Sequence, residues 1–181
     1  MPRNIEIKAR ILAVPGMPGM PGVAALLPRA RALADGPEQA ITQDDTFFHA
    51  PHGRLKLREF ADGSAELIHY QRADTEAASA SDYVRAAVPD PAALREALAR
   101  GLGVQGRVRK QRLLLMVGST RIHLDQVEGL GDFIELEVVL AEGQTDAQGV
   151  ATAEALMQAL GLGAAQRLAV AYLDLLAVRG P

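Results

Sequence analysis

The segment TRIHLDQVEGLGDFIELEVVL, residues 120–140, decides the fold. It alternates charged or polar residues with aliphatic ones, which is the two-residue period of β-strands. Its first strand, 120–127, places on one face the side chains of Arg121, His123 and Asp125. Its second strand, 133–140, places Glu135 and Glu137 together on one face. The segment therefore predicts two strands that each have a charged face and an apolar face.

The same alternation recurs outward from this segment, along the rest of the chain. Three further strands with charged faces are expected at 4–12, 54–60 and 108–117. Their charged faces carry Glu6, Lys8 and Arg10, then Arg54, Lys56 and Arg58, then Lys110 and Arg112. Less regular strands are expected at 46–48, 65–72 and 83–88. Together these segments make about eight strands, mostly in hairpin order.

Helices are predicted between and after the strands, at 23–35, 90–100, 147–160 and 164–178. Strands in hairpin order with helices on one side predict an α+β fold: a closed antiparallel eight-stranded β-barrel with helices packed outside. A length of 181 residues fits one domain, which we place at 1–178. The Pro-Gly-Met repeat at 15–22 can hold neither helix nor strand, so we expect a flexible insertion there.

The composition excludes several classes of function. There is no Cys, so disulfides, thiolate zinc sites and a cysteine nucleophile are ruled out. A net charge of −3 and an aromatic content of 4% argue against binding nucleic acid by charge or by base stacking. The chain shows no signal region and no apolar run of membrane length, so we expect a cytoplasmic protein without a membrane partner.

The charged strand faces have two interpretations. For any single strand, a charged face that looks at water is the more common arrangement. Recurrence in several strands favours the other one, because helices would cover the apolar face and a closed sheet would then enclose the charges. Arg and Lys in a confined lumen suit a chain of phosphates. Glu and Asp beside them would repel that anion unless a divalent cation lies between, and oxygen ligands favour Mg²⁺ or Mn²⁺.

Six motifs at these residues resemble the CYTH family, also called triphosphate tunnel metalloenzymes, which includes class IV adenylate cyclases, thiamine triphosphatases and inorganic triphosphatases. In chain order they are NIEIKAR (4–10), QDDTFF (43–48), LKLR (55–58), RVRKQR (107–112), LDQVEGLGDFIELE (124–137) and AYLDLL (171–176). They follow the family's order and span nearly the whole chain. The resemblance implies a tunnel in which a divalent metal and basic side chains hold a triphosphate.

The resemblance also implies roles for individual residues. The expected catalytic residues are Glu6, Lys8, Glu135 and Glu137. The expected ligands of the divalent cation are Glu6, Asp125, Glu135 and Glu137. The residues expected to bind phosphate are Lys8, Arg10, Lys56, Arg58, Arg72, Lys110, Arg112 and Arg121. Asn4 stands where the family's signature has its first Glu, so a second cation would be held more weakly.

Two other side chains receive more modest roles. We expect His123 to line the lumen as a hydrogen-bonding residue rather than to act as a general base, although its ordinary pKa would suit that role. Tyr172 is expected to be a packing residue of the last helix.

Three functions remain open at this point. The favoured one is metal-dependent hydrolysis of a triphosphate such as tripolyphosphate, ATP or thiamine triphosphate. The second is that of a class IV adenylate cyclase, which converts ATP to cyclic AMP and pyrophosphate. The third is a module that binds polyphosphate or a nucleotide without turnover, which Asn4 keeps open. We expect no nucleic-acid partner, and a homodimer is compatible with the sequence.

Overall fold

The computed structural model describes residues 3–11, 22–72, 79–163 and 167–179. The predicted insertion at 15–22 lies outside these residues except for Gly22, which begins the first helix. In the described part of the chain, no helix has both the length and the apolar character needed to cross a membrane.

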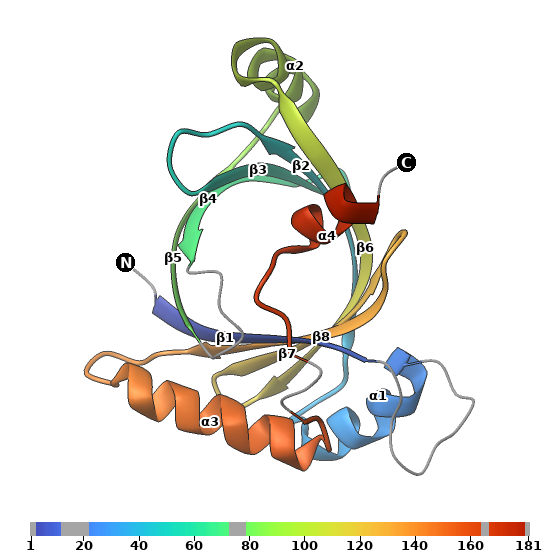
Figure 1. Ribbon diagram of the computed structural model, residues 1–181, viewed down its shortest axis with the longest axis vertical. Coiled ribbons are helices and arrows are strands. Elements are labelled where there is room, and N and C mark those ends of the chain that lie inside the picture. The colour runs from blue at the N-terminus through green and yellow to red at the C-terminus, as the bar shows by residue number, and fades with distance from the viewer. Residues whose placement is uncertain (1–2, 12–21, 73–78, 164–166, 180–181) are drawn as a thin grey trace.

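The fold is built on eight strands: β1 (Arg3–Arg10), β2 (Gln39–Phe48), β3 (Arg54–Phe60), β4 (Ala65–Arg72), β5 (Ser79–Ala87), β6 (Val104–Val117), β7 (Thr120–Val127) and β8 (Gly131–Val139). Every neighbouring pair is antiparallel, and the strand order is β1-β5-β4-β3-β2-β6-β7-β8, with β1 paired to both β5 and β8. Figure 1 shows the strands curled around a central space, with α1, α2 and α3 outside them and α4 over that space. The α+β class and the eight antiparallel strands are therefore confirmed.

The seam of this ring is short. β1 pairs with β8 over seven residue pairs but with β5 over only four, from Arg3 with Asp82 to Glu6 with Ser79. Because β8 occupies the other edge of β1, the next contacts on the β5 side come from the chain near its C-terminus. There Ala9 pairs with Arg167, and the N–H of residue 168 donates to the carbonyl of residue 8 at 2.9 Å. The closed barrel expected from the sequence is thus a strongly curled sheet that is joined along only part of its seam.

The two ends of the barrel differ in what covers them. β1, β2, β4 and β7 run in one direction and the other four strands in the opposite one. We call the end where β1 begins the first end and the end where β1 finishes the second end. The last helix, α4 (Tyr172–Arg179), lies over the second end, where it packs against β6 and contacts Val127 and Phe133.

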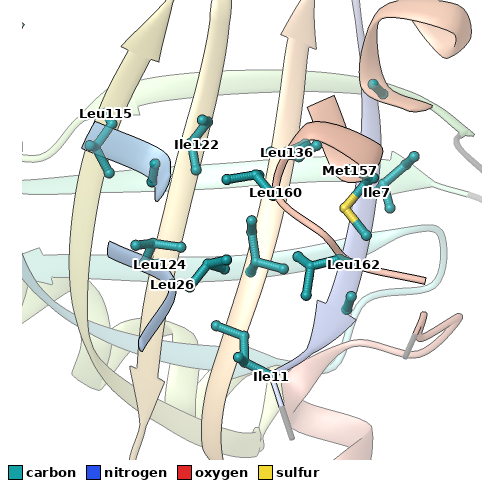
Figure 2. Close-up of a cluster of buried hydrophobic side chains, with 14 of the residues drawn as sticks. Ile7, Ile11, Leu26, Leu115, Ile122, Leu124, Leu136, Met157, Leu160 and Leu162 are labelled. Carbon is teal, nitrogen blue, oxygen red and sulfur yellow. The ribbon is translucent and has the colours of Figure 1, made fainter. Parts of the chain in front are cut away.

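The main hydrophobic core lies on the outer surface of the sheet. α1 (Gly22–Leu33) and α3 (Asp146–Ala159) cover β1, β7 and β8 there, and α2 (Pro91–Leu102) covers β2 and β3. Figure 2 shows the side chains that fill this layer, among them Ile7, Leu26, Ile122, Leu124, Leu136 and Met157. Each of these is at most 2% exposed, and such burial stabilises a fold by about 1.5–3 kcal/mol per side chain. Because these aliphatic residues alternate with the charged ones, packing them outward turns the charged side chains into the lumen.

Several elements differ from the sequence-based prediction, among them β5 and β6, which each begin four residues earlier than expected, at Ser79 and Val104. β2 begins at Gln39 rather than at 46, because it pairs along β6 over ten residues. The predicted helix at 164–178 is confirmed only from Tyr172 onward, since Arg167 pairs with β1 instead. Residues 164–166 of that prediction lie outside the described chain.

Candidate functional site

The lumen contains a cavity of about 370 Å³ to which all eight strands contribute side chains. That volume falls within the range of small-molecule binding sites. Among the described residues that line it, the basic ones are Lys8, Lys56, Arg58, Arg85, Lys110, Arg112 and Arg121. The acidic ones in the same lining are Glu6, Asp45, Glu66, Glu135 and Glu137. The lumen is therefore densely charged, with both signs present.

The charges are divided between two walls. We call the part built by β1 and β8 the acidic wall, because it carries Glu6, Glu135 and Glu137 beside Asn4 and one cation, Lys8. We call the part built by β3, β2 and β6 the basic wall, because it carries Lys56, Arg58, Lys110 and Arg112. The division follows from the strand order, which makes β1 and β8 neighbours and places β2 between β3 and β6.

One buried carboxylate, Asp45 of β2, organises the first half of the basic wall. Its two oxygens accept hydrogen bonds from Arg58 Nε and Nη2, both at 2.7 Å, and from Lys56 Nζ at 2.8 Å. Burial alone would raise the pKa of Asp45, but Lys56 and Arg58 hold it well below its usual value. Asp45 is therefore ionised at neutral pH and fixes the two cations side by side.

A second buried carboxylate, Asp125 of β7, organises the other half. It accepts two hydrogen bonds at 2.6 Å from Arg112, a bidentate geometry that holds the guanidinium in one plane. Lys110 Nζ lies 3.5 Å away, and the hydroxyl of Tyr172 donates to the same carboxylate at 3.1 Å. Burial opposes ionisation, yet Arg112 and Lys110 hold the pKa of Asp125 far below its usual value.

The two lysines of the basic wall are under electrostatic strain. Burial, reinforced by the Arg58 guanidinium, lowers the pKa of Lys56 to about 8. Burial and the neighbouring Arg112 lower the pKa of Lys110 to about 7. Both ammonium groups would gain from an additional anion in the lumen, because Asp45 and Asp125 do not fully offset the cations around them.

The acidic wall brings like charges together. Glu6 and Glu137 are directly opposite partners in the β1–β8 ladder, an arrangement that is destabilising without a cation nearby. Arg121 Nη1 lies 3.1 Å from Glu137, and the amide nitrogen of Asn4 donates to the same carboxylate. Glu135 accepts from Arg112 at 2.9 Å, and Lys8 is its partner in the ladder. Burial would raise the pKa of Glu135, but Lys8 and Arg112 hold it well below its usual value.

His123 sits between the two carboxylates of β8. Its Nδ1 is 3.8 Å from Glu135 and its Nε2 is 3.9 Å from Glu137, which is too far for hydrogen bonds. Burial, together with the Arg112 charge, lowers the pKa of His123, so the ring is neutral at pH 7. The expectation that His123 lines the lumen is confirmed by its place in the cavity wall, but its buried Nδ1 makes no hydrogen bond with any described residue, so the expected hydrogen bonding is not seen at that atom.

The donors on the acidic wall fit a hard divalent cation. Oδ1 of Asn4 is buried, and no described residue donates a hydrogen bond to it. Nowhere in the described ranges do three His, Asp or Glu side chains come together as a complete metal cage. Mg²⁺ commonly binds through one or two carboxylates and completes its shell with water and substrate phosphates. Glu6 and Glu137, with the Asn4 amide oxygen, match that pattern.

Most of the residues predicted to form the site come together in the cavity. Those in its lining are Glu6, Lys8, Lys56, Arg58, Lys110, Arg112, Arg121, Glu135 and Glu137. Arg10 does not join them: it donates to the carbonyl of Leu130 at 2.9 Å and stacks over Phe133 near the second end. Asp125 is fully buried behind the lining, where Arg112 holds it. The side chain of Arg72 lies outside what the structure describes.

Several lining residues were not assigned a role from the sequence. Asp45 is the most important of them. The sequence feature that could have revealed its place in the lumen is its spacing of two from Gln43 and from Phe47, on a strand beside two strongly basic strands. Oε1 of Gln43 is buried without a hydrogen-bond partner in the described chain, as is Oδ1 of Asn4. Glu66 and Arg85 face each other at 3.9 Å across β4 and β5 near the first end.

Comparisons with known proteins give one family and several structural neighbours. The family model described as CYTH domain matches residues 3–172. The PH1012 protein of Pyrococcus horikoshii OT3 superposes with a TM-score of 0.82 at 22% identity, covering 96% of this chain and 99% of that one. A conserved hypothetical protein from Pyrococcus furiosus gives 0.80 at 20% identity, covering 96% and 99%. A proposed adenylate cyclase from Vibrio parahaemolyticus gives 0.74 at 20% identity, covering 96% and 97%. No curated protein matches the chain.

Proposed function

The chain belongs to the CYTH domain family, and from that premise we propose that it is a divalent-metal-dependent enzyme that hydrolyses a short triphosphate in the barrel lumen. The observation that carries the proposal is the division of the lining of one cavity into a basic wall and an acidic wall. A polyanion alone would satisfy the first wall and a cation alone the second. A triphosphate with its divalent cation satisfies both.

The basic wall is the phosphate-binding surface. Arg58 and Arg112 are held in plane by Asp45 and Asp125 and present their remaining N–H groups as a rigid fork. Lys56 and Lys110 add point charges that a phosphate chain would stabilise. These cations neutralise the substrate and stabilise the charge that develops on the transferred phosphoryl group.

The acidic wall is the metal-binding surface. Glu6 and Glu137 would hold the cation with Asn4 as a neutral third donor, and Glu135 lies within the same wall. A divalent cation there supplies positive charge to phosphoryl oxygens and to an attacking water. The neutral Asn4 reduces the negative charge available to a second cation, so we propose that one cation is bound tightly.

The reaction is an in-line displacement. A water oxygen forms a new bond to the terminal phosphorus, and the bond to the neighbouring bridging oxygen breaks. Pyrophosphate leaves with that electron pair and takes up the proton that the water releases. Lys8 and Arg121 flank the carboxylates of β8 and are placed to bind the oxygens of the terminal phosphate. Positioning and electrostatics carry this chemistry, and no covalent intermediate on the protein is required.

The test is product analysis with a matched pair of variants. Purified protein is incubated with tripolyphosphate, or with ATP, in Mg²⁺ or Mn²⁺, and every product is identified. We expect phosphate and pyrophosphate from tripolyphosphate, a loss of at least 100-fold in Glu137→Gln, and no change in Glu96→Gln, whose side chain is exposed on α2.

The other outcomes are equally definite. Cyclic AMP and pyrophosphate from ATP would replace hydrolysis by the cyclase reaction, for which the same walls would serve. Metal-independent binding without any product would leave a binding module. Full activity in Glu137→Gln would contradict the assigned role of the acidic wall.

A further inference from the structure

Tyr172, the first residue of α4, contacts cations from both sides of the lumen. The Nζ of Lys8 on β1 lies 4.3 Å from the centre of its ring, and the Nζ of Lys110 on β6 lies 5.2 Å from it. Its hydroxyl donates to Asp125, and its side chain lines the cavity while being 6% exposed. One aromatic side chain from the C-terminal helix thus meets three charged residues of the site.

These contacts fix the positions of the two lysines. An ammonium over an aromatic face is attracted to the ring, and the attraction grows when both groups are buried. Lys8 and Lys110 are each 6% exposed. β1 and β6 are separated by β7 and β8, so no strand ladder sets the distance between these two ammonium groups directly. The ring is the surface that they share.

Tyr172 is itself held rigidly. Its ring meets Phe133 edge-on, with the ring centres 4.9 Å apart. The next residue, Leu173, packs against Gly106 of β6 so closely that a Cβ there would lie 2.5 Å from its Cδ1. Asp174 accepts two hydrogen bonds from Arg54, at 3.1 and 2.7 Å. α4 therefore cannot shift without breaking contacts with β3, β6 and β8.

We propose that Tyr172 is a positioning residue for substrate binding: its ring holds Lys8 and Lys110 at a spacing that receives neighbouring phosphates, and its hydroxyl fixes the Asp125 that orients Arg112. This inference rests on the proposed function and goes beyond the packing role expected from the sequence. It assigns part of the phosphate site to the C-terminal helix, which carries none of the residues proposed to bind phosphate.

The experiment compares three variants in tripolyphosphate hydrolysis with Mg²⁺ and in calorimetric binding of tripolyphosphate with a chelator present. Tyr172→Leu removes ring and hydroxyl, and we expect its KM and Kd to rise about tenfold while kcat changes less than threefold. Tyr172→Phe keeps the ring and is expected to retain KM within about threefold. Leu130→Ala is the matched control, because it opens a cavity in the same apolar cluster while leaving α4 and its contact with Gly106 intact.

Each result decides something. A KM for Tyr172→Leu equal to that of Leu130→Ala, at a similar loss in Tm, would reduce Tyr172 to packing and overturn the inference. A Tyr172→Phe protein as impaired as Tyr172→Leu would overturn the role of the ring. Wild-type protein that binds tripolyphosphate with the same Kd as Tyr172→Leu overturns this inference alone. Wild-type protein that binds no tripolyphosphate overturns the proposed function with it.

Discussion

Asp45 shows how a single buried carboxylate maintains the basic wall. It is 2% exposed and pairs with both Lys56 and Arg58. Asp45→Asn would leave two buried cations without a countercharge, so we expect the free energy of unfolding to fall by about 3 kcal/mol. Tripolyphosphate should restore more stability to this variant than to wild type, because its phosphates replace the missing charge. Denaturant unfolding with and without tripolyphosphate measures both effects.

The control for this prediction is Glu96→Gln on the exposed face of α2. A surface substitution of that kind is expected to change stability by less than about 0.5 kcal/mol. An Asp45→Asn protein as stable as the control would show that the Asp45 pairs are energetically neutral. A variant that gains no more stability from tripolyphosphate than wild type would show that the phosphates do not replace the missing charge.

Lys56 should make both the stability of the fold and the binding of triphosphate depend on pH. Burial lowers its pKa in the folded protein to about 8, below the 10.5 of an exposed lysine. Between these two pH values the unfolded chain therefore binds more protons than the folded one, and this lysine makes the free protein more stable as pH rises through that window. A bound triphosphate favours the charged ammonium, so binding above pH 8 should take up protons and weaken with increasing pH.

Proton uptake is measured by calorimetric titration with tripolyphosphate near pH 9 in buffers of different ionisation enthalpy. We expect an uptake of about one proton per site or more, because Lys110, whose pKa burial lowers to about 7, is also largely neutral there. Lys56→Met should reduce the uptake. A binding enthalpy that is the same in every buffer would mean that neither lysine changes its charge.

At the scale of elements, most strands were predictable, including 65–72, which has the bounds of β4, whereas the first residues of β2, β5 and β6 were missed. Where charged and aliphatic residues alternate, as in 120–127, the period of two set the strand and also which side chains face the lumen. The first part of β2 was missed because Thr42 and Gln43, on opposite faces, are both polar, so no apolar period marks the strand. Its ten pairs with β6 come from the sheet as a whole.

The candidate site was predictable to the same extent. Lumen residues on regularly alternating strands were found from their spacing and motifs, whereas Tyr172 was not. A helical period shows which side of a helix is apolar, but it cannot show that the ring at its first residue meets Lys8 and Lys110. Arg10 has the right spacing on β1, yet it lies two residues beyond Lys8 toward the second end, and it donates to the carbonyl of Leu130 instead.

α4 is held by a close approach that can be tested at Gly106. Because a Cβ at this position would lie 2.5 Å from Leu173 Cδ1, we expect Gly106→Ala to destabilise the fold by about 1–3 kcal/mol. Leu173→Ala alone leaves a cavity and is also destabilising. In the double variant the shorter side chain makes room for the new methyl group. Its loss of unfolding free energy should therefore be smaller than the sum of the two single-variant losses.

The measurement is a double-mutant cycle of unfolding free energies. An interaction energy of about 1 kcal/mol or more in the compensating direction is expected. Strict additivity would show that α4 has another way to accommodate Gly106→Ala, and that this contact does not set its position.

The whole molecule has opposite charge balances inside and outside. The chain carries a net charge of −3, yet the described lining of the lumen holds more basic than acidic side chains. Water screens charges on the outer surface well, whereas the buried cations of the lumen are screened much less. The buried cations of the free protein therefore repel one another, and a ligand that neutralises them should stabilise the entire fold.

We accordingly expect tripolyphosphate with Mg²⁺ to raise the Tm. A ligand at 100 times its Kd adds about 2.7 kcal/mol, which for a chain of this size corresponds to roughly 5–10 °C. All eight strands line the lumen, and we place the whole of residues 1–178 in one domain, so a single unfolding transition should move as a unit. Differential scanning calorimetry distinguishes a single transition whose Tm rises with tripolyphosphate from two transitions of which only one shifts. That second result would mean that part of the chain folds independently of the site, and an unchanged Tm would mean that the enclosed charges do not bind the triphosphate.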